Sequence, residues 1–265
     1  MGYQGRDVEV VFLAADQCMV AACDSCGAIG DKEFDVVPVP QYIVGRFTTR
    51  VALLEVLSVG AIPAVVTVAI SNEPSPTGEE ILAGVRDELK EIGKPDLPVV
   101  ISTEKNIPTK QTGVGVTVVG AVERKGLRIG TTQPGDRMYC LGLPKVGPEV
   151  QRADDEEIAQ ASHILKLFQV EGIHDVLPVG SRGIRAEAKT LAEGLGCCFS
   201  EWPPSGLDLE KSAGPSTCVL FTACPEVQLD EFTGTPLQVI GEVIQSANHS
   251  GVSDESVTAL TRKNQ

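Results

Sequence analysis

The sequence predicts an α/β protein whose helices and strands are divided between two domains. A helix-length apolar segment, residues 45–63, is followed at once by the β-branched run 64–70, as in a layered α/β domain. The turn 134–136 then precedes a fresh strand at 137–142, which indicates a domain boundary just before it. We therefore expect an N-terminal domain over residues 1–130 and a C-terminal domain over residues 131–265.

The length, composition and net charge of the chain limit the class of protein to which it can belong. With 265 residues, 42% hydrophobic and 22% charged, the chain can bury a substantial core and has the composition of a soluble globular protein. No apolar run approaches the roughly 20 residues that span a bilayer, and the first residues lack a signal-peptide layout, so we expect no membrane association and a cytoplasmic location. The net charge of −14 argues against a nucleic-acid partner. It is compatible with nucleotides, because carboxylates that collect a divalent metal can bind polyphosphate.

The apolar helix 45–63 is the element around which we expect the chain to be organised. It is apolar on nearly every side, which predicts burial, and Gly60 and Pro63 mark its end. It contains one carboxylate, Glu55. A buried carboxylate needs a partner, so the sequence predicts either a metal ion or an ion pair with Arg46 or Arg50.

The remaining elements follow from local pattern. In the first domain we expect strands at 8–13, 18–23, 64–70, 99–101 and 113–120, a proline-marked edge segment at 36–40, a loop at 25–35 and a helix at 79–92. The run 64–70 is apolar throughout, which predicts a strand covered on both faces. In the second domain we expect strands at 137–142, 217–222 and 237–243, helices at 154–170, 183–194 and 228–232, a loop at 171–181, and a polar tail from Asn248.

The eight cysteines do not form a recognisable zinc or disulfide pattern. Cys23 and Cys26 have the spacing of half a zinc site or of a redox pair, but no second pair follows and the three histidines are scattered. We therefore expect reduced cysteines that serve mainly as small core residues.

Four acidic residues occupy similar places in the predicted elements. Asp16 follows the first strand, Asp24 ends the second and Glu104 follows the strand 99–101, while Glu55 lies in the buried helix. Ligands of open α/β sheets bind at strand ends, and oxygen ligands without clustered histidine or cysteine favour magnesium or manganese. The alternative is that these are four unrelated surface acids.

Six motifs, in order along almost the whole chain, resemble the aminoimidazole ribonucleotide synthetase superfamily. They are Cys23–Ser25 with Gly45, Glu55 to Pro63, Ser102–Glu104, the junction Arg128–Asp136, Ile173–Val176 with Lys211–Gly214, and Val239–Val243. The resemblance implies a two-domain α/β architecture whose N-terminal mixed sheet pairs with its copy in a homodimer. The many apolar strands with proline-marked edges also favour a homodimer through residues 1–130.

Within the superfamily, three segments are most similar to α-ribazole kinases: Ala22–Gly30, Tyr42–Thr48 and Ser102–Asn106. This similarity implies ATP- and magnesium-dependent phosphorylation of a ribosyl 5′-hydroxyl, with α-ribazole, a precursor of the cobalamin lower ligand, as the nucleoside substrate. Two alternatives stay open. One is another ATP-dependent member, either thiamine-monophosphate-kinase-like, amide-activating or cyclising; the other is a nucleotide-binding dimer without turnover.

The resemblance also assigns expected roles to single residues. Asp16, Asp24, Glu55 and Glu104 would hold magnesium; Ser25, Thr103, Lys105 and Arg128 would bind ATP; and Asp175, with His174, would orient the acceptor hydroxyl. Glutamates stand at Glu55 and Glu104 where the superfamily carries aspartates, and the glycine-rich turn of the second domain is replaced by Gly142–Pro148. A loop-capping role for His174 and Asp175 is the alternative to a catalytic one.

Overall fold

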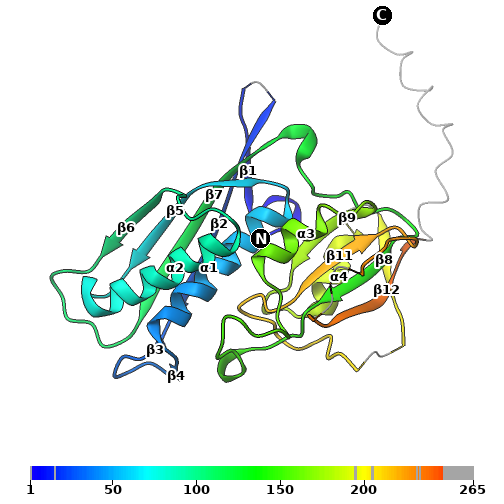
Figure 1. Ribbon diagram of the computed structural model, residues 1–265. Coiled ribbons are helices and arrows are strands. Elements are labelled where there is room, and N and C mark those ends of the chain that lie inside the picture. The colour runs from blue at the N-terminus through cyan, green and yellow to red at the C-terminus, as the bar shows by residue number, and fades with distance from the viewer. Residues whose placement is uncertain are drawn as a thin grey trace, which may run out of the picture.

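The structure, a computed structural model, describes residues 2–14, 16–193, 196–203, 206–230, 232 and 234–246. Figure 1 shows two β-sheets side by side, with α1 and α2 across the first. The predicted tail from Asn248 lies outside the described residues. Within them, none of the helices combines the length and apolarity needed to cross a bilayer.

The first sheet is mixed, as expected, and has the order β1-β2-β7-β5-β6. Its strands are β1 (Glu9–Phe12), β2 (Gln17–Gly27), β5 (Ile62–Ile70), β6 (Val99–Thr103) and β7 (Gly113–Glu123). Only the β5–β6 pair is parallel. β2 runs on to Gly27, so Asp24 lies inside the strand and does not end it as predicted. The proline-marked segment contributes β4 (Val37–Pro38), which pairs with β3 (Ile29–Gly30).

The second sheet is antiparallel and has the order β10-β12-β8-β11-β9. Its strands are β8 (Arg137–Leu141), β9 (Ile173–Pro178), β10 (Cys197–Glu201), β11 (Val219–Ala223) and β12 (Leu237–Gln245). Two helices accompany it, α3 (Ala161–Leu167) and α4 (Ile184–Glu193). The predicted boundary at 130/131 lies in the segment that joins β7 to β8.

Three predictions for the second domain are wrong. The helix expected at 154–170 is limited to α3, because 154–160 are turns held by local polar contacts such as Lys145–Asp155. The loop expected at 171–181 contains β9, an edge strand whose sequence does not alternate cleanly between apolar and polar residues. The described part of 228–232 is not helical.

The helix α1 (Gln41–Ser58) holds the two sheets together, which confirms it as the central element. It packs against β2 and β7 on one side, and against α3 and β9 on the other. The largest apolar core is accordingly continuous from the first sheet through Leu53 and Val56 to Phe221 of the second. Gly60 ends α1 with φ +81°, a conformation that glycine adopts without strain.

Glycine also sets the distance between α1 and α2 (Glu79–Glu91). A Cβ at Gly45 would overlap the Ile81 carbonyl, and one at Gly84 would overlap the Tyr42 carbonyl. The helices therefore cross with their backbones in close contact. This approach brings Glu88 of α2 against α1, where it forms ion pairs with Arg46 and Arg50.

The first sheet is covered on one face only. Along β5, Val66, Val68 and Ile70 are buried, but Ile62 is 62% exposed and Ala69 is also exposed. The expectation that this strand is covered on both faces is therefore wrong within one chain. An apolar strand with one open face in a single chain indicates a surface that another molecule could cover.

Candidate active site

A cavity of about 410 Å³ lies where the two domains meet. Its first-domain wall comes from the end of β2, from β3 and β4, and from the first half of α1. Its second-domain wall comes from two loops. The lining residues are Asp24, Ser25, Cys26, Gly27, Ile29, Val37, Val39, Ile43, Val44, Phe47, Thr48, Val146, Gly147, Val150, Gly214 and Pro215.

The helix α1 supplies a regular part of this wall. Ile43 and Val44 are followed one turn later by Phe47 and Thr48, so the four side chains lie on one face of the helix. The facing loop carries Val146, Gly147 and Val150. The helical turn Gly147–Glu149 also contacts β4. Beside the cavity, Phe47 of α1 and Val150 of the facing loop belong to one apolar cluster that joins the two domains.

Asp24 is the one carboxylate in the lining. It is half-buried, and burial raises its pKa to about 6, although the backbone N–H of Ser25 lowers it in part. Burial, with the charges of Asp24 and Asp35, raises the pKa of the Cys26 thiol to about 11. Cys26 is therefore a neutral thiol at pH 7, whereas Asp24 titrates close to neutrality.

Glu55 lies further along α1 and is buried without the arginine partner that the sequence allowed. Arg46 and Arg50 both pair with Glu88 instead, and among the described residues Glu55 Oε2 has no hydrogen-bond partner. The pKa of Glu55 is raised to about 8, mainly by burial and in part by nearby carboxylates, Asp24 among them, while Arg6 acts to lower it.

Because Glu55 is buried without a partner among the described residues, we expect the stability of the folded chain to depend on pH. Because its folded pKa lies above the usual 4.5, the folded chain loses stability as the pH rises from about 4.5 to 8. Glu55→Gln cannot ionise, so its melting temperature should exceed that of the wild type by an amount that grows over this range. The gap should correspond to a few kcal/mol and level off above pH 8. Scanning fluorimetry in chelator checks this; identical pH profiles would contradict a buried, unpartnered carboxyl group.

The four predicted metal ligands do not gather at one place. Asp16 lies at the turn before β2, roughly 25 Å along the strand from Asp24. Glu104 follows β6. Two strands, β7 and β5, lie between β6 and β2, so β6 is about 14 Å from β2. The expectation that these four residues gather at one site is therefore wrong within one chain. Among the described residues, no group of three or more potential ligands forms a metal site.

Among the predicted ligands, Asp24 contributes to the raised pKa of Glu55. Magnesium is commonly held by one or two carboxylates together with water and substrate phosphates. The orphaned Oε2 of Glu55 and the half-buried carboxylate of Asp24 fit that donor chemistry. When bound, the ion would neutralise phosphate charge beside the cavity.

Thr103 and Lys105 line a separate, shallow depression of about 460 Å³ at the β6 edge, together with Pro74, Ser102 and Asn106. Glu104, in the same loop, accepts hydrogen bonds from the backbone N–H groups of Asn106 (2.6 Å) and Ile107 (3.1 Å). These donors lower the pKa of Glu104. The structure therefore divides three of the four predicted ATP ligands between two places, with Ser25 at the cavity and Thr103 and Lys105 at the sheet edge.

Asp175 is almost completely buried at the junction between the domains. It forms an ion pair with Arg6 and accepts hydrogen bonds from the backbone N–H groups of Gly130 (2.9 Å), Thr131 (3.3 Å) and Val176 (3.1 Å). These contacts fix the linker against β9. They favour the loop-capping alternative, and the catalytic role of Asp175 stays a prediction.

His174 and Arg128 belong to the same junction. His174 Nδ1 lies 2.7 Å from Asp136 Oδ2, and Arg128 donates to the Ile173 carbonyl (3.2 Å) while its guanidinium lies 4.3 Å from the Phe168 ring centre. Neither lines the cavity between the domains. The role of His174 toward the acceptor hydroxyl and that of Arg128 toward the ATP phosphates therefore stay predictions.

No protein-family model and no curated protein matches this chain. Among solved structures, thiamine monophosphate kinase (ThiL) from Aquifex aeolicus matches with a TM-score of 0.63 at 15% identity, over 91% of this chain and 89% of that one. AaThiL complexed with AMPPCP and TMP gives the same TM-score and identity, over 91% and 85% of the two chains.

This chain shares the fold of thiamine monophosphate kinase. Thermotoga maritima PurL complexed with ATP also matches, with a TM-score of 0.55 at 18% identity, over 92% of this chain and 38% of that one. The two-domain α/β fold implied by the sequence resemblance is therefore confirmed. At such low identities the likeness concerns the fold alone.

Proposed function

We propose that this chain is an ATP- and magnesium-dependent kinase that transfers the γ-phosphoryl group of ATP to a small molecule. The observation that carries the proposal is the cavity between the domains, which is large enough for a small acceptor and has Asp24 in its wall. The shared fold supports it, because AaThiL has been solved with AMPPCP and TMP. Phosphoryl transfer depends mainly on positioning and charge neutralisation, which a preformed cavity beside carboxylates can supply.

Asp24 and Glu55 would hold magnesium, which would neutralise the charge on the transferred group. Ser25 lies beside Asp24 and would donate a hydrogen bond to the substrate from its hydroxyl. Lys105 is exposed at the β6 edge, apart from the cavity, and its role toward the ATP phosphates stays a prediction. We expect direct transfer without a phosphoenzyme. Cys26, a thiol in the cavity lining, has a raised pKa and is a poor nucleophile at pH 7.

Two acceptors are proposed. The sequence motifs favour the 5′-hydroxyl of α-ribazole, whereas the structural likeness to ThiL favours thiamine monophosphate at least as well. The chain should be incubated with ATP, magnesium and each acceptor in turn, and the phosphorylated product should be measured. ATP-dependent product from either acceptor supports a kinase. ATP binding without any product would favour the non-catalytic nucleotide-binding dimer.

We further propose that the chain forms a homodimer through the open face of the first sheet. Val11, Met19, Ala121 and Ile62 occupy neighbouring positions in one row of that face, and Val11 (47%), Met19 (37%) and Ile62 (62%) are exposed in the single chain. Val100 on β6 is 59% exposed. Apolar exposure across a sheet face is typical of a protein interface.

The dimer makes a direct prediction. Ile62→Glu buries a charge in the expected interface, so its apparent mass in sedimentation velocity should fall to that of the monomer at concentrations where the wild type is dimeric. Ile107→Glu is the control, because Ile107 is 66% exposed in a loop outside the sheet. A wild-type chain that is monomeric at all concentrations and fully active would contradict the proposal.

A further inference from the structure

The segment that joins β8 to α3, residues 142–160, forms part of the cavity wall and is called the strap below. It contributes Val146, Gly147 and Val150 to the lining. Apart from the single helical turn Gly147–Glu149, it consists of turns and irregular chain. Irregular chain keeps a fixed shape only where polar contacts hold its backbone, so these contacts decide how firmly the wall is placed.

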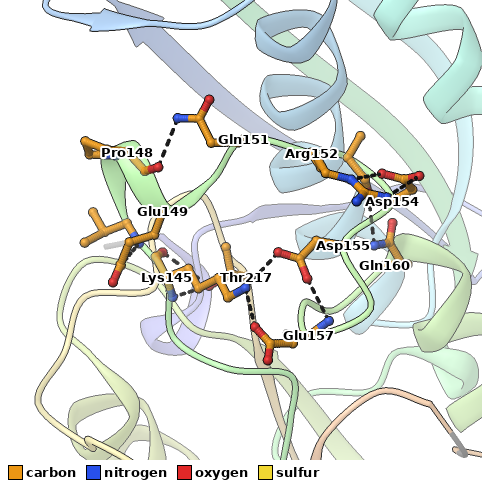
Figure 2. A network of polar contacts seen from close by, with 12 residues as sticks. Lys145, Pro148, Glu149, Gln151, Arg152, Asp154, Asp155, Glu157, Gln160 and Thr217 are labelled. Carbon is orange, nitrogen blue, oxygen red and sulfur yellow. Dashed lines mark hydrogen bonds and ion pairs between the residues drawn. The ribbon is translucent and has the colours of Figure 1, made fainter.

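Lys145 ties the two arms of the strap together. Its Nζ lies 2.7 Å from Asp155 Oδ2 and 2.6 Å from Glu157 Oε2, so one ammonium group bridges two carboxylates of the opposite arm. Figure 2 shows this ammonium group between the two carboxylates. The Leu143 N–H donates to the Glu157 carbonyl (2.7 Å) between the same two arms. The ends of the strap are therefore closed on each other, as in an Ω-loop.

Thr217 attaches both arms to the second domain. It is 1% exposed and lies two positions before β11. Its Oγ1 accepts a hydrogen bond from the Lys145 N–H (2.8 Å), and its carbonyl oxygen accepts one from the Ala159 N–H (2.7 Å). The same loop carries the lining residues Gly214 and Pro215. Lys145 is thus fixed through both its side chain and its backbone, directly before the part of the strap that lines the cavity.

The middle of the strap is held separately, by the first domain. Arg50 of α1 donates to the Ala153 carbonyl (2.9 Å), and Ala153 packs in one apolar cluster with Phe47. This attachment does not involve Lys145. Loss of the Lys145 bridge would therefore leave the strap folded against α1 and would release the arm that carries Val146.

Resting on the proposed kinase function, we propose that Lys145 is a positioning residue for the acceptor. It does not touch the acceptor, because Asp155 and Glu157 occupy its ammonium group. It acts by fixing Val146 and Gly147 in the cavity wall, and a displaced wall holds the acceptor more weakly and in poorer alignment for transfer. None of the predicted ATP ligands belongs to the strap, so the effect falls on the acceptor and not on ATP.

Three variants test this role. Lys145→Met removes the ammonium group and keeps a side chain of similar length, whereas Lys145→Arg keeps a cation that can bridge the two carboxylates. Arg152→Met is the matched control, because Arg152 pairs with Asp154 in the same strap but the two side chains are 72% and 77% exposed.

Lys145→Met should raise the KM of the acceptor at least tenfold and leave the KM of ATP within twofold of the wild type. Lys145→Arg and Arg152→Met should keep both values within threefold. The melting temperature of Lys145→Met should fall by no more than about 4 °C, since ion pairs open to water contribute little to stability. An unchanged acceptor KM, an equal rise in both KM values, or a larger loss of stability that Lys145→Arg does not reverse would overturn the proposal.

Hydrogen exchange separates this role from the kinase function. Mass spectrometry follows the amides of residues 142–160 in the full chain, with α-ribazole or thiamine monophosphate added and no ATP. In the wild type we expect an acceptor to slow exchange in the strap at least about threefold, and in Lys145→Met we expect this slowing to be lost. Slowing without any phosphorylated product would end the kinase proposal and leave the role of Lys145 in place. No slowing by either compound, or equal slowing in both chains, would overturn that role even if phosphoryl transfer occurs.

Discussion

Asp24→Asn is expected to lower ATP-dependent phosphorylation at least about 100-fold while making the chain more stable at pH 7. The activity falls because the variant loses the carboxylate proposed to hold magnesium beside the acceptor. The stability rises because burial raises the pKa of Asp24 to about 6, above the usual 3.8. The folded wild type therefore loses stability as the pH rises from about 4 to 6 and stays at the lower level above that range.

The gain at pH 7 should reach at most about 3 kcal/mol, and it should vanish at pH 3, where the carboxylate is protonated in both states. Thermal unfolding at the two pH values measures it. Asp96→Asn, at an exposed site outside the cavity lining, is the control and should change neither property. An Asp24→Asn variant that is less stable at pH 7, or fully active, would contradict this account of Asp24.

Glu88→Ala is expected to destabilise the chain by about 3–5 kcal/mol. Glu88 is completely buried, and its carboxylate lies 2.6 Å from Arg46 Nε and 2.7 Å from Arg50 Nε. Arg50 is itself fully buried, so removing Glu88 leaves an uncompensated charge between α1 and α2. The melting temperature should fall by roughly 6–20 °C, given 2–4 °C per kcal/mol for a domain of this size.

The same variant should weaken acceptor binding, because α1 carries Phe47 and Thr48 into the cavity wall. Glu91→Ala is the matched control on the same helix, since Glu91 is exposed and its contact with Ser162 is long, at 3.5 Å. Its effect should stay within about 0.5 kcal/mol. Equal melting temperatures for the two variants would show that the buried ion pairs contribute nothing to the packing of α1 against α2.

Much of the fold could be predicted because local pattern and burial agree in the first domain. The apolar helix ending at Gly60 and the alternation along β7 are strong local signals that the tertiary structure does not override. In the second domain β9 was missed, because a short edge strand that carries His174 and Pro178 has no clear periodicity. The helix expected from Asp154 was overextended, because acidic residues there pair with Lys145 instead of starting a helix.

The candidate site could be predicted only in part. Asp24 and Ser25 were found because they stand in a recognisable motif, and both line the cavity. The apolar lining residues Phe47 and Val150 carry no chemical signature in sequence, although the i, i+4 spacing along α1 could have indicated a common face. Asp175 was assigned a substrate role because nothing in sequence shows that Arg6, 169 positions away, would pair with it.

The central claim, transfer of the γ-phosphoryl group to a small acceptor, is tested most directly by a single-turnover experiment with γ-labelled ATP. The chain, magnesium and α-ribazole or thiamine monophosphate are mixed, quenched and separated into protein, nucleotide, acceptor and free phosphate. We predict label on the acceptor at the rate of ATP loss, with none on the protein. Label found only as free phosphate beside a cyclised or dehydrated product, or held on the protein, would contradict the account.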